Sequence, residues 1–556
     1  MSKFLRKHYL SVISLLITIL LLSPYLFTNF ISYEHDTFFH LSRIEGYAQA
    51  LWHLDFFPKI YPLKNGNFGY PSPIFYCDLF LLIPAIIYKL SGSLVLAYKL
   101  LVVILIYLTS LFMGITTKHF TKNKLAVILA MVLYSFATYH ITDIYIRSAV
   151  GELFGMMLMP LVILAAYKLL YEKANYHLLT IVFTALLLSH ILSFILACIL
   201  FLGILILNYR QLNKPVLLTI FKAMGQTILL TAFFTLPILE QLFTQDLVVE
   251  NYSNASLLAT STLFIGQYFQ TRPNYATFSN SFLSMSVNPG LLITFLPISY
   301  FLNINLKKNS LNYYLKTLII LGYFFLIIQS SAFDYRNFTI LGFLQFIWRF
   351  MMLASVLLVI PASIYALKLW QKYQQIVFSI IVTIAIGLTI FLITPQFYRT
   401  NQLTYLTSYN DIINGKIIDP YYSATYKRVE LAGGDYLPQT SIDYQNWEPG
   451  LYNNQYELIS TDFKVNYNQL TFNLDLPNQT IILPKTYYKG YQITIDNQKI
   501  TPFLDEKTGL LAFNTGNTSG LYTLSYVKTP IQKISLLISL ISLAIIIIKK
   551  LLNKTA

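Results

Sequence analysis

Long apolar runs separated by short polar clusters dominate the chain. The first run reaches roughly to Phe30, which is enough to cross a bilayer at about 20 residues per helix. Eleven further predicted spans lie near 94–118, 125–141, 153–170, 178–189, 191–207, 217–239, 290–305, 314–330, 347–366, 376–394 and 529–548. This pattern predicts about twelve transmembrane helices with both termini inside. The division between 178 and 208 depends on a break at Ser189 and His190, because a single tilted helix there would invert every later orientation.

Composition and charge support this class. Hydrophobic residues make up 56% of the chain and charged residues only 11%, which excludes an ordinary soluble domain. The formal net charge is +15, but the basic residues occur in short clusters between the apolar runs. That distribution is typical of cytoplasmic loops and does not indicate a nucleic-acid partner. Cys77 and Cys198 lie in or beside apolar stretches, so neither a disulfide framework nor a cysteine metal site is predicted.

The polar segments divide the chain into parts. Residues 1–395 are predicted to form the transmembrane domain, with a first outer loop at 31–93 and a lid-like outer loop at 240–289. From 396 to 528 the apolar positions alternate, as in L-T-F-N-L-D-L and Y-Q-I-T-I-D, which indicates a small extracytoplasmic β-rich domain. Residues 529–556 supply the last helix and a cytoplasmic tail. The predicted fold class is an all-α polytopic membrane protein with a β-rich domain near the C-terminus.

Ionisable residues follow the first span directly. His35, Asp36, His40 and Arg43 lie at the start of the first outer loop, and ionisable groups at a membrane boundary are costly and usually functional. A helix beginning near Thr37 would place the Asp36 carboxylate at its N-terminus, where it could accept a proton. Asp36 could equally serve only as the N-cap of that helix.

A second cluster lies in D-I-Y-I-R-S-A-V-G-E, after the third span and on the same predicted face. Asp143, Arg147 and Glu152 occur there within one short turn-and-helix region. Asp143 and Arg147 have the i, i+4 spacing of a simple helix ion pair. The alternative is that Arg147 binds an anion.

The third cluster is L-Q-F-I-W-R-F, at the predicted outer end of a later span. Arg349 could extend to lipid head groups within an aromatic belt. Together with the amide of Gln345 it is also suited to binding a phosphate. His190 interrupts a hydrophobic stretch and is expected to be a buried, hydrogen-bonded histidine.

The arginines and carboxylates of these clusters lie on one predicted side of the membrane. Together they are suited to bind a lipid phosphate that carries a sugar. A carboxylate would accept the proton of an acceptor hydroxyl, while cationic groups stabilise the departing lipid phosphate.

Several segments also resemble a known group of bacterial membrane proteins. They are H-D-T-F-F-H-L-S-R-I-E-G, F-P-K-I-Y-P, G-Y-P-S-P-I-F-Y, I-R-S-A-V-G-E, L-Q-F-I-W-R-F, G-G-D-Y-L-P and Y-Y-K-G-Y-Q-I-T-I-D-N-Q. In this order they resemble the YfhO-like proteins and the group labelled 6-pyruvoyl-tetrahydropterin-synthase-related. Those proteins are similar to GT-C glycosyltransferases, which span the membrane many times and use polyprenyl-phosphate sugars outside the cytoplasm.

The resemblance implies a catalytic acidic residue at Asp36. Asp143 is expected to be a second acidic residue that positions the acceptor or a metal. The phosphate-binding candidates are Arg43, Lys59, Arg147 and Arg349, and the supporting residues are His35, His40, Glu152, His190 and Gln345. Family members often have arginine in place of Lys59 and proline in place of Ile347. A zinc site made by His35, His40 and His53 is not favoured, since no pterin-enzyme domain surrounds them. The metal is unknown, and a divalent cation remains open.

The expected function is therefore sugar transfer from a polyprenyl-phosphate donor to an envelope polymer or glycolipid acceptor, such as teichoic acid. The site would face outward from the bacterial cytoplasmic membrane. One alternative is a transporter or flippase of a lipid-linked saccharide, although such proteins tend to place charges near the midplane and to have paired halves. Another is a noncatalytic protein that binds an envelope polymer.

Overall fold

The computed structural model describes residues 3–32, 35–173, 175–248, 255–270, 285–303, 306, 309–397, 402–403, 435–440 and 449–555. The chain divides into two compact units. Unit 1 comprises Met1–Thr37, Val95–Thr227 and Tyr252–Tyr405, and unit 2 comprises Phe38–Leu94, Ile228–Asn251 and Leu406–Ala556.

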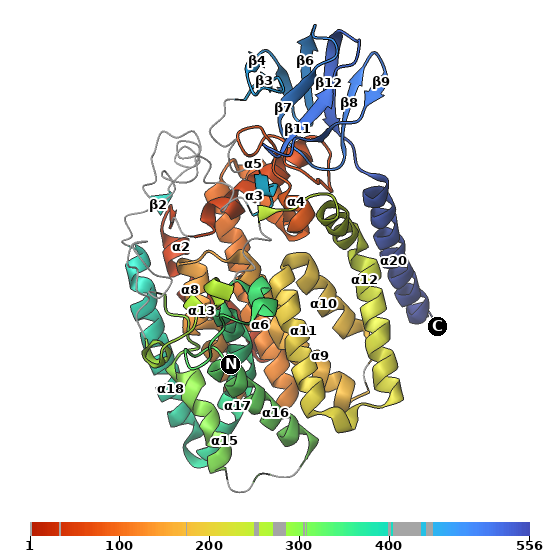
Figure 1. The fold of residues 1–556 in the computed structure, drawn as a ribbon. Coiled ribbons are helices and arrows are strands. Elements are labelled where there is room, and N and C mark those ends of the chain that lie inside the picture. The colour runs from red at the N-terminus through yellow and green to blue at the C-terminus, as the bar shows by residue number, and fades with distance from the viewer. Residues whose placement is uncertain are drawn as a thin grey trace. The chain divides into compact units, whose positions relative to one another are not determined.

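Unit 1 is a bundle of helices (Figure 1). Its α-helices are α1 (Lys3–Leu21), α2 (Ser23–Phe27), α6 (Leu94–Phe120), α7 (Lys124–Ser135), α8 (Thr138–Tyr145), α9 (Val150–Tyr171), α10 (His177–Ser189), α11 (Ile191–Leu207), the first half of α12 (Lys214–Leu242), α13 (Ala255–Thr260), α14 (Leu291–Phe295), α15 (Ser299–Leu302), α16 (Ser310–Ile327), α17 (Met351–Leu369) and α18 (Gln374–Ile393). Short 3₁₀ segments are η2 (Tyr209–Gln211), η4 (Ile265–Phe269), η6 (Leu296–Ile298), η7 (Thr339–Leu344), η8 (Ile347–Phe350), η9 (Gln371–Tyr373) and η10 (Thr394–Phe397). Strands β1 (Ile31–Ser32) and β2 (Gln402–Leu403) pair antiparallel.

Helix α17 lies at the centre of this bundle and packs against α7, α9 and α16. It is apolar on every side and nearly all of it is buried, as expected for a helix surrounded by other helices. Gly322 of α16 lies against Leu358 of α17, where the absence of a side chain allows close approach.

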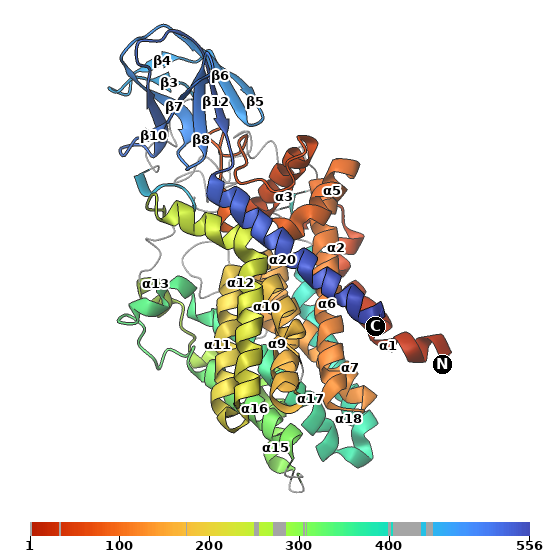
Figure 2. The same ribbon diagram turned by 90° about the vertical axis from the view of Figure 1, so that its right-hand side faces the viewer.

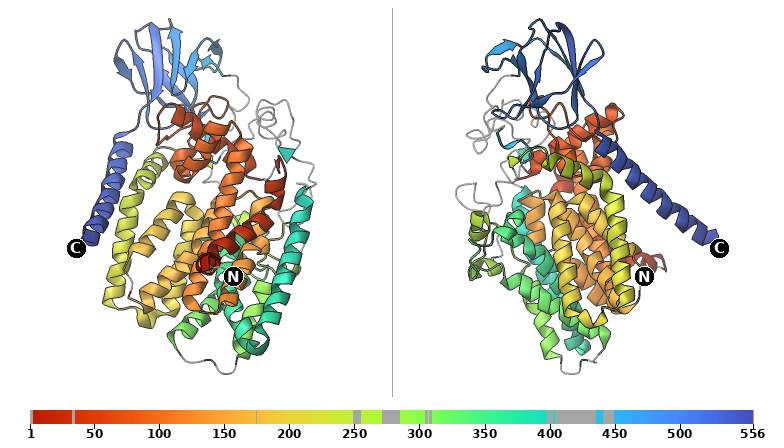
Figure 3. Two further views of the ribbon diagram at one scale, coloured as in Figure 1. Left: turned by 180° about the vertical axis from the view of Figure 1, so that it is seen from behind. Right: turned by 45° about the vertical axis from the view of Figure 1, so that its right-hand side comes forward.

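Helices α10 and α11 form a hairpin (Figure 3). Gly155 near the start of α9 lies against Ser193 at the start of α11. At the other end, the Tyr171 hydroxyl donates to Asn208 Oδ1 over 2.6 Å. α9 and α11 are therefore parallel, and α10, which contacts both, runs antiparallel to them. The break at His190 is confirmed, since this residue is extended and its side chain caps α11.

Within the described residues, seven helices are long and apolar enough to cross a membrane. They correspond to seven of the twelve predicted spans and include α6, α9, α12, α16, the η8–α17 segment, the η9–α18–η10 segment and Pro530–Leu552. Helices α7 and α8 together would make an eighth, bent by 44°. The four other predicted spans coincide with shorter apolar helices at Lys7–Leu21, His177–Ser189, Ile191–Leu207 and Leu291–Leu302. The total of twelve stays a prediction.

Unit 2 combines short helices with a β-sandwich and two long helices. It contains α3 (Thr37–Trp52, apart from its first residue), α4 (Ser72–Phe75), η1 (Leu79–Leu81), α5 (Leu82–Ser91), the second half of α12 and α20 (Pro530–Thr555). The start of α3 at Thr37 agrees with the sequence prediction.

The β-sandwich consists of two five-stranded sheets (Figure 2). Its strands are β3 (Leu451–Tyr452), β4 (Leu458–Ser460), β5 (Lys464–Asn466), β6 (Gln469–Leu474), β7 (Thr480–Thr486), β8 (Tyr491–Ile495), β9 (Gln498–Ile500), β10 (Phe503–Leu504), β11 (Leu510–Asn514) and β12 (Gly520–Tyr526). The order is β10-β11-β7-β3-β4 in one sheet and β5-β6-β12-β8-β9 in the other.

Both alternating patterns noted in the sequence form strands of the second sheet. Phe472 of β6 pairs with Tyr522 of β12, and their rings stack 5.6 Å apart. Asp496 and Asn497 form the tight turn between β8 and β9, each with a positive φ, as a two-residue hairpin turn requires. The predicted β-rich domain at 396–528 also includes 398–401, 404–434 and 441–448, which lie outside the described residues, as do 249–254 and 271–284 of the predicted lid.

Candidate active site

A sharp turn between α8 and α9 builds the central part of the candidate site. Ser148 has a φ of +50°, a conformation that non-glycine residues adopt only under constraint. The Ala149 amide donates to the Asp143 carbonyl over 3.0 Å, and the Arg147 amide donates to the Thr142 carbonyl over 3.0 Å. The turn therefore holds Arg147 beside the ends of both helices.

Buried ion pairs join this turn to the start of the η8–α17 segment. Arg147 contacts Asp143 Oδ1 through Nη1 at 2.6 Å and Glu152 Oε1 through Nη2 at 2.8 Å. Glu152 Oε1 also accepts from Nε of Arg349 over 3.1 Å, across 197 positions of sequence. The Tyr139 hydroxyl donates to the second oxygen of Glu152. Glu152 is thus the carboxylate shared by both arginines.

Arg349 is positioned by the segment before it. Gln345 has a φ of +59°, and its Oε1 accepts from Arg349 Nη1 over 2.9 Å. The same Nη1 donates to the Leu344 carbonyl over 2.6 Å. Phe346 stacks on Trp348 and lies 5.3 Å from the guanidinium carbon. Nη2 of Arg349 makes no hydrogen bond to any residue in the described part of the chain.

Asp36 joins the cluster through its backbone. Its amide donates to the Arg147 carbonyl over 3.0 Å, and the neighbouring Thr37 hydroxyl donates to Ser148 Oγ over 2.9 Å. The Asp36 carboxyl itself accepts no hydrogen bond from the described residues. Because it is poorly hydrated, its pKa rises to about 6, although the positive charges of Arg147 and Arg349 partly oppose this shift. The pKa of Asp36 therefore lies close to the pH at which a general base operates in cells.

Charge distribution separates the roles of the two arginines. Three carboxylates, those of Asp36, Asp143 and Glu152, face two guanidinium groups. Among the described residues, Arg147 pairs with two carboxylates, whereas Arg349 pairs with one and has an Nη2 group without a partner. Arg349 is therefore the better candidate to receive an additional anion. Oδ2 of Asp143 is buried without a hydrogen-bond partner among the described residues.

Among the described residues, no group of three or more His, Cys, Asp or Glu side chains is arranged to hold a metal ion. Burial and the Arg147 charge lower the pKa of His35 to about 4, so its ring is neutral near pH 7. His190 interacts with Ser193 Oγ at 2.8 Å, in the hydrogen-bonded role expected for it.

The remaining predicted residues lie in unit 2. Arg43 Nε donates to Asp78 Oδ1 over 2.7 Å, Nη1 lies 3.2 Å from His40 Nδ1, and the guanidinium carbon lies 3.8 Å from the ring centre of Tyr76. These contacts already compensate its charge. Lys59 donates to the Phe233 carbonyl over 2.9 Å, and burial lowers its pKa to about 8.

Sequence reasoning missed Asp78 and Tyr139. Asp78 precedes a short apolar helix and carries no motif, although it is the partner of Arg43. Tyr139 lies four residues before Asp143, on the same face of α8, and that spacing was the available signal.

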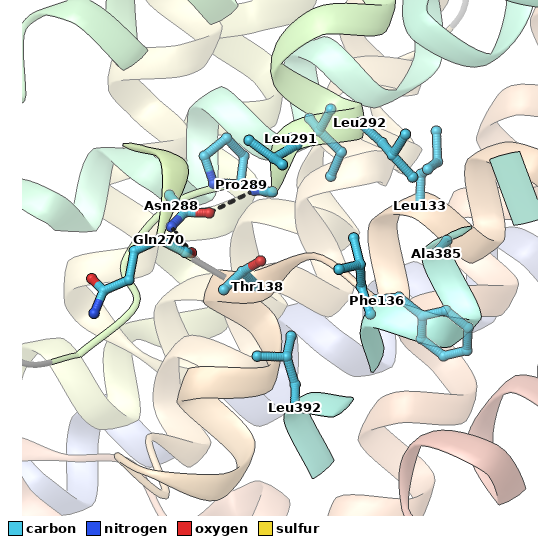
Figure 4. A pocket seen from close by; sticks show the side chains of 13 residues that line it. Leu133, Phe136, Thr138, Gln270, Asn288, Pro289, Leu291, Leu292, Ala385 and Leu392 are labelled. Carbon is cyan, nitrogen blue, oxygen red and sulfur yellow. Dashed lines mark hydrogen bonds between the residues drawn. The ribbon is translucent and has the colours of Figure 1, made fainter. Parts of the chain in front are cut away.

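A pocket that is partly open to solvent lies between α7, α8, α14 and α18 (Figure 4). Its walls are mostly apolar, with Leu133, Phe136, Leu291, Leu292 and Leu392 among them. Thr138, Gln270 and Asn288 supply polar groups. Thr138 directly precedes Tyr139 on α8, so one short helix contributes to both the pocket and the ion-pair cluster.

No protein-family model matches the chain, and no curated protein matches it significantly. One solved structure that matches is the arabinofuranosyltransferase AftD from mycobacteria, with 12% sequence identity and a TM-score of 0.47. The match covers 94% of this chain and 40% of AftD. The chain therefore spans less than half the length of that protein.

Proposed function

We propose that this chain is a membrane glycosyltransferase that moves a sugar from a polyprenyl-phosphate donor to a hydroxyl of an extracytoplasmic envelope polymer or glycolipid. The observation that carries the proposal is the Asp36 carboxyl. It has no hydrogen-bond partner among the described residues, its pKa is about 6, and it lies within the electrostatic influence of Arg147 and Arg349. The family resemblance of the surrounding sequence supports the same assignment.

In the proposed reaction Asp36 accepts the proton of the acceptor hydroxyl as that oxygen bonds to the anomeric carbon. The bond between the anomeric carbon and the phosphate oxygen breaks, and polyprenyl phosphate leaves with its electron pair. Arg349, through its unused Nη2, stabilises the charge that develops on the phosphate. Arg147 and Glu152 hold Arg349 and the turn at Asp36 in position. Asp36 then returns its proton to water.

Two further features agree with a lipid-linked donor. The apolar pocket beside Thr138 suits part of a prenyl chain, because its walls are aliphatic and aromatic. The cationic groups lie at the ends of long apolar helices, where a lipid phosphate would be located. Sugar transfer measured with and without a chelator tests whether a divalent cation takes part.

The direct test uses purified protein in detergent with polyprenyl-phosphate sugars and isolated envelope polymers. We expect sugar to appear covalently bound to the polymer, since transfer needs no sealed membrane. Translocation of lipid-linked sugar in proteoliposomes without transfer in detergent would favour a flippase and contradict the proposal. Polymer binding without sugar transfer would also contradict the proposal and would indicate a noncatalytic binding protein.

A further inference from the structure

Two loops of unit 1 expose several large apolar side chains. The first loop contains η4 and the second contains η7. The exposed residues are Phe264, Ile265, Phe269, Phe338, Ile340 and Phe343, which we call the apolar loop surface. Ile265 and Ile340 are 81% and 80% exposed. Soluble monomers rarely expose such patches unless the patch binds something.

Hydrogen bonds join the first loop to the end of α16. The Leu263 amide donates to the Gln329 carbonyl over 2.8 Å, and the Ser331 amide donates to the Leu263 carbonyl over 2.9 Å. The Tyr268 hydroxyl donates to the Leu326 carbonyl over 2.9 Å. Leu326 belongs to the last turn of α16, a candidate span, so the first loop lies at the depth at which α16 ends.

Further contacts connect the loops to the start of the next span. Ser261 Oγ accepts from the Ile347 amide over 2.9 Å, and the candidate span that contains α17 begins at Ile347. Helix α13, which precedes the first loop, packs against η7. Both loops therefore lie where two neighbouring spans meet the membrane boundary.

Helix α16, whose end the first loop contacts, also exposes apolar side chains along its length. Ile320, Phe324 and Ile327 are 46%, 52% and 56% exposed along that helix, as expected for side chains that contact lipid. An exposed apolar surface at the end of a lipid-facing helix, at the membrane boundary, is best covered by the same lipid.

We propose that the apolar loop surface inserts into the leaflet at which α16 ends, with phospholipid as its occupant. The second loop leads directly into Gln345, and Arg349 follows four residues later. Insertion therefore holds Arg349 near the depth of lipid phosphates. On the proposed function, a lipid-linked donor would reach Arg349 laterally from this leaflet.

Spin-label accessibility tests the insertion without relying on enzyme activity. Ile265→Cys and Ile340→Cys are introduced separately into full-length protein in which Cys77 and Cys198 are replaced by serine. The labelled proteins are placed in vesicles of phosphatidylethanolamine and phosphatidylglycerol. Phe324→Cys on α16 is the lipid-exposed control, and Asn454→Cys in the exposed turn of the β-sandwich is the aqueous control.

We expect labels at 265 and 340 to be accessible to oxygen and protected from a water-soluble nickel complex, as at 324. Nickel accessibility equal to that at 454 would overturn the proposal, since the loops would then lie in water. Protection from both reagents would also overturn it, because protein rather than lipid would then cover the surface. Labels are interpreted only in proteins whose elution profile matches the cysteine-free parent.

A second measurement separates insertion from the proposed function. Ile265→Asn combined with Ile340→Asn should lower transfer from a long-chain donor in vesicles several-fold, while transfer from a short-chain donor in detergent stays at the parent level. An equal loss with both donors would contradict a role in membrane access. If the parent protein transfers no sugar, the proposed function fails while the spin-label result still decides the insertion.

Discussion

At the scale of single residues, the site depends on how burial and charge act on Asp36. Loss of hydration raises its pKa to about 6, and the nearby arginines keep the pKa from rising further. The carboxylate is therefore ionised near pH 7 yet more basic than an ordinary aspartate. Both properties favour proton acceptance.

This pKa leads to a prediction about pH. Because only ionised Asp36 can accept a proton, kcat/KM should be constant above about pH 7 and should fall about tenfold per unit below pH 6. A pH profile of sugar transfer measures this. An acid limb centred near pH 4, the ordinary range for aspartate, would indicate that Asp36 is well hydrated and contradict the assignment.

The shared carboxylate of Glu152 is expected to contribute to the stability of the fold. Glu152→Gln would leave two buried guanidinium groups with too little negative charge, which we expect to cost about 3 kcal/mol of unfolding free energy. Thermal or denaturant unfolding in detergent would measure it. The matched control is Glu172→Gln, because Glu172 pairs with His119 at the surface and its side chain is 40% exposed; a change below about 0.5 kcal/mol is expected there. Equal effects of the two variants would contradict the shared-carboxylate account.

Local spacing predicted some of these contacts and could not predict others. The Asp143–Arg147 pair follows from the i, i+4 spacing within one short region. The Glu152–Arg349 contact joins residues 197 positions apart, and only tertiary packing determines it. The same applies to Arg43, whose anion partner Asp78 lies 35 positions away in the sequence.

At the scale of elements, close packing of α9 and α11 positions one side of the site. A Cβ on Gly155 would fall far inside contact distance of Ser193 Oγ. Gly155 is one turn from Glu152 on α9. The glycine therefore allows α11 to approach the helix that carries the shared carboxylate.

We expect Gly155→Ala to destabilise the protein by about 1–3 kcal/mol, because α11 must move to admit the methyl group. Gly225→Ala on α12 is the control, since a Cβ at that position would have no neighbouring atom within 4 Å; it should not lower stability. The stabilities of the two variants are compared by their unfolding midpoints. A Gly155→Ala protein as stable as the parent would show that the helices have room.

Elements were predicted best where one periodicity extends over the whole segment. Strands β6 and β8 and the start of α3 follow from the sequence pattern. The bend between α7 and α8 does not, because the apolar run continues through it. The left-handed Gln345 was also beyond prediction, since no glycine or turn motif marks it.

At the scale of the whole molecule, the hairpin of α10 and α11 determines on which side of the membrane each later loop lies. Because α9 and α11 are parallel, the chain returns to the side from which α10 began. The loops before α10 and after α11 should therefore share one side, which the basic residues Lys173, Arg210 and Lys214 indicate to be cytoplasmic.

Cysteine labelling in intact cells tests this arrangement. Asn175→Cys and Asn213→Cys, in the same cysteine-free parent, should both be protected from a membrane-impermeant maleimide, whereas Asn454→Cys in the β-sandwich should react. Labelling of only one of the first two would mean that α10 and α11 together cross the membrane once, and the outward orientation of the later elements would be wrong.

The most direct measurement of the central claim is the kcat for sugar transfer by Asp36→Asn protein. The amide keeps the size of the side chain but cannot accept the proton, so we expect kcat to fall by about 10²–10⁴-fold. Asp334→Asn, which alters an exposed carboxylate paired with Arg336, should retain the parent rate. Equal transfer by the parent and by Asp36→Asn protein would contradict the assignment of Asp36 as the proton acceptor.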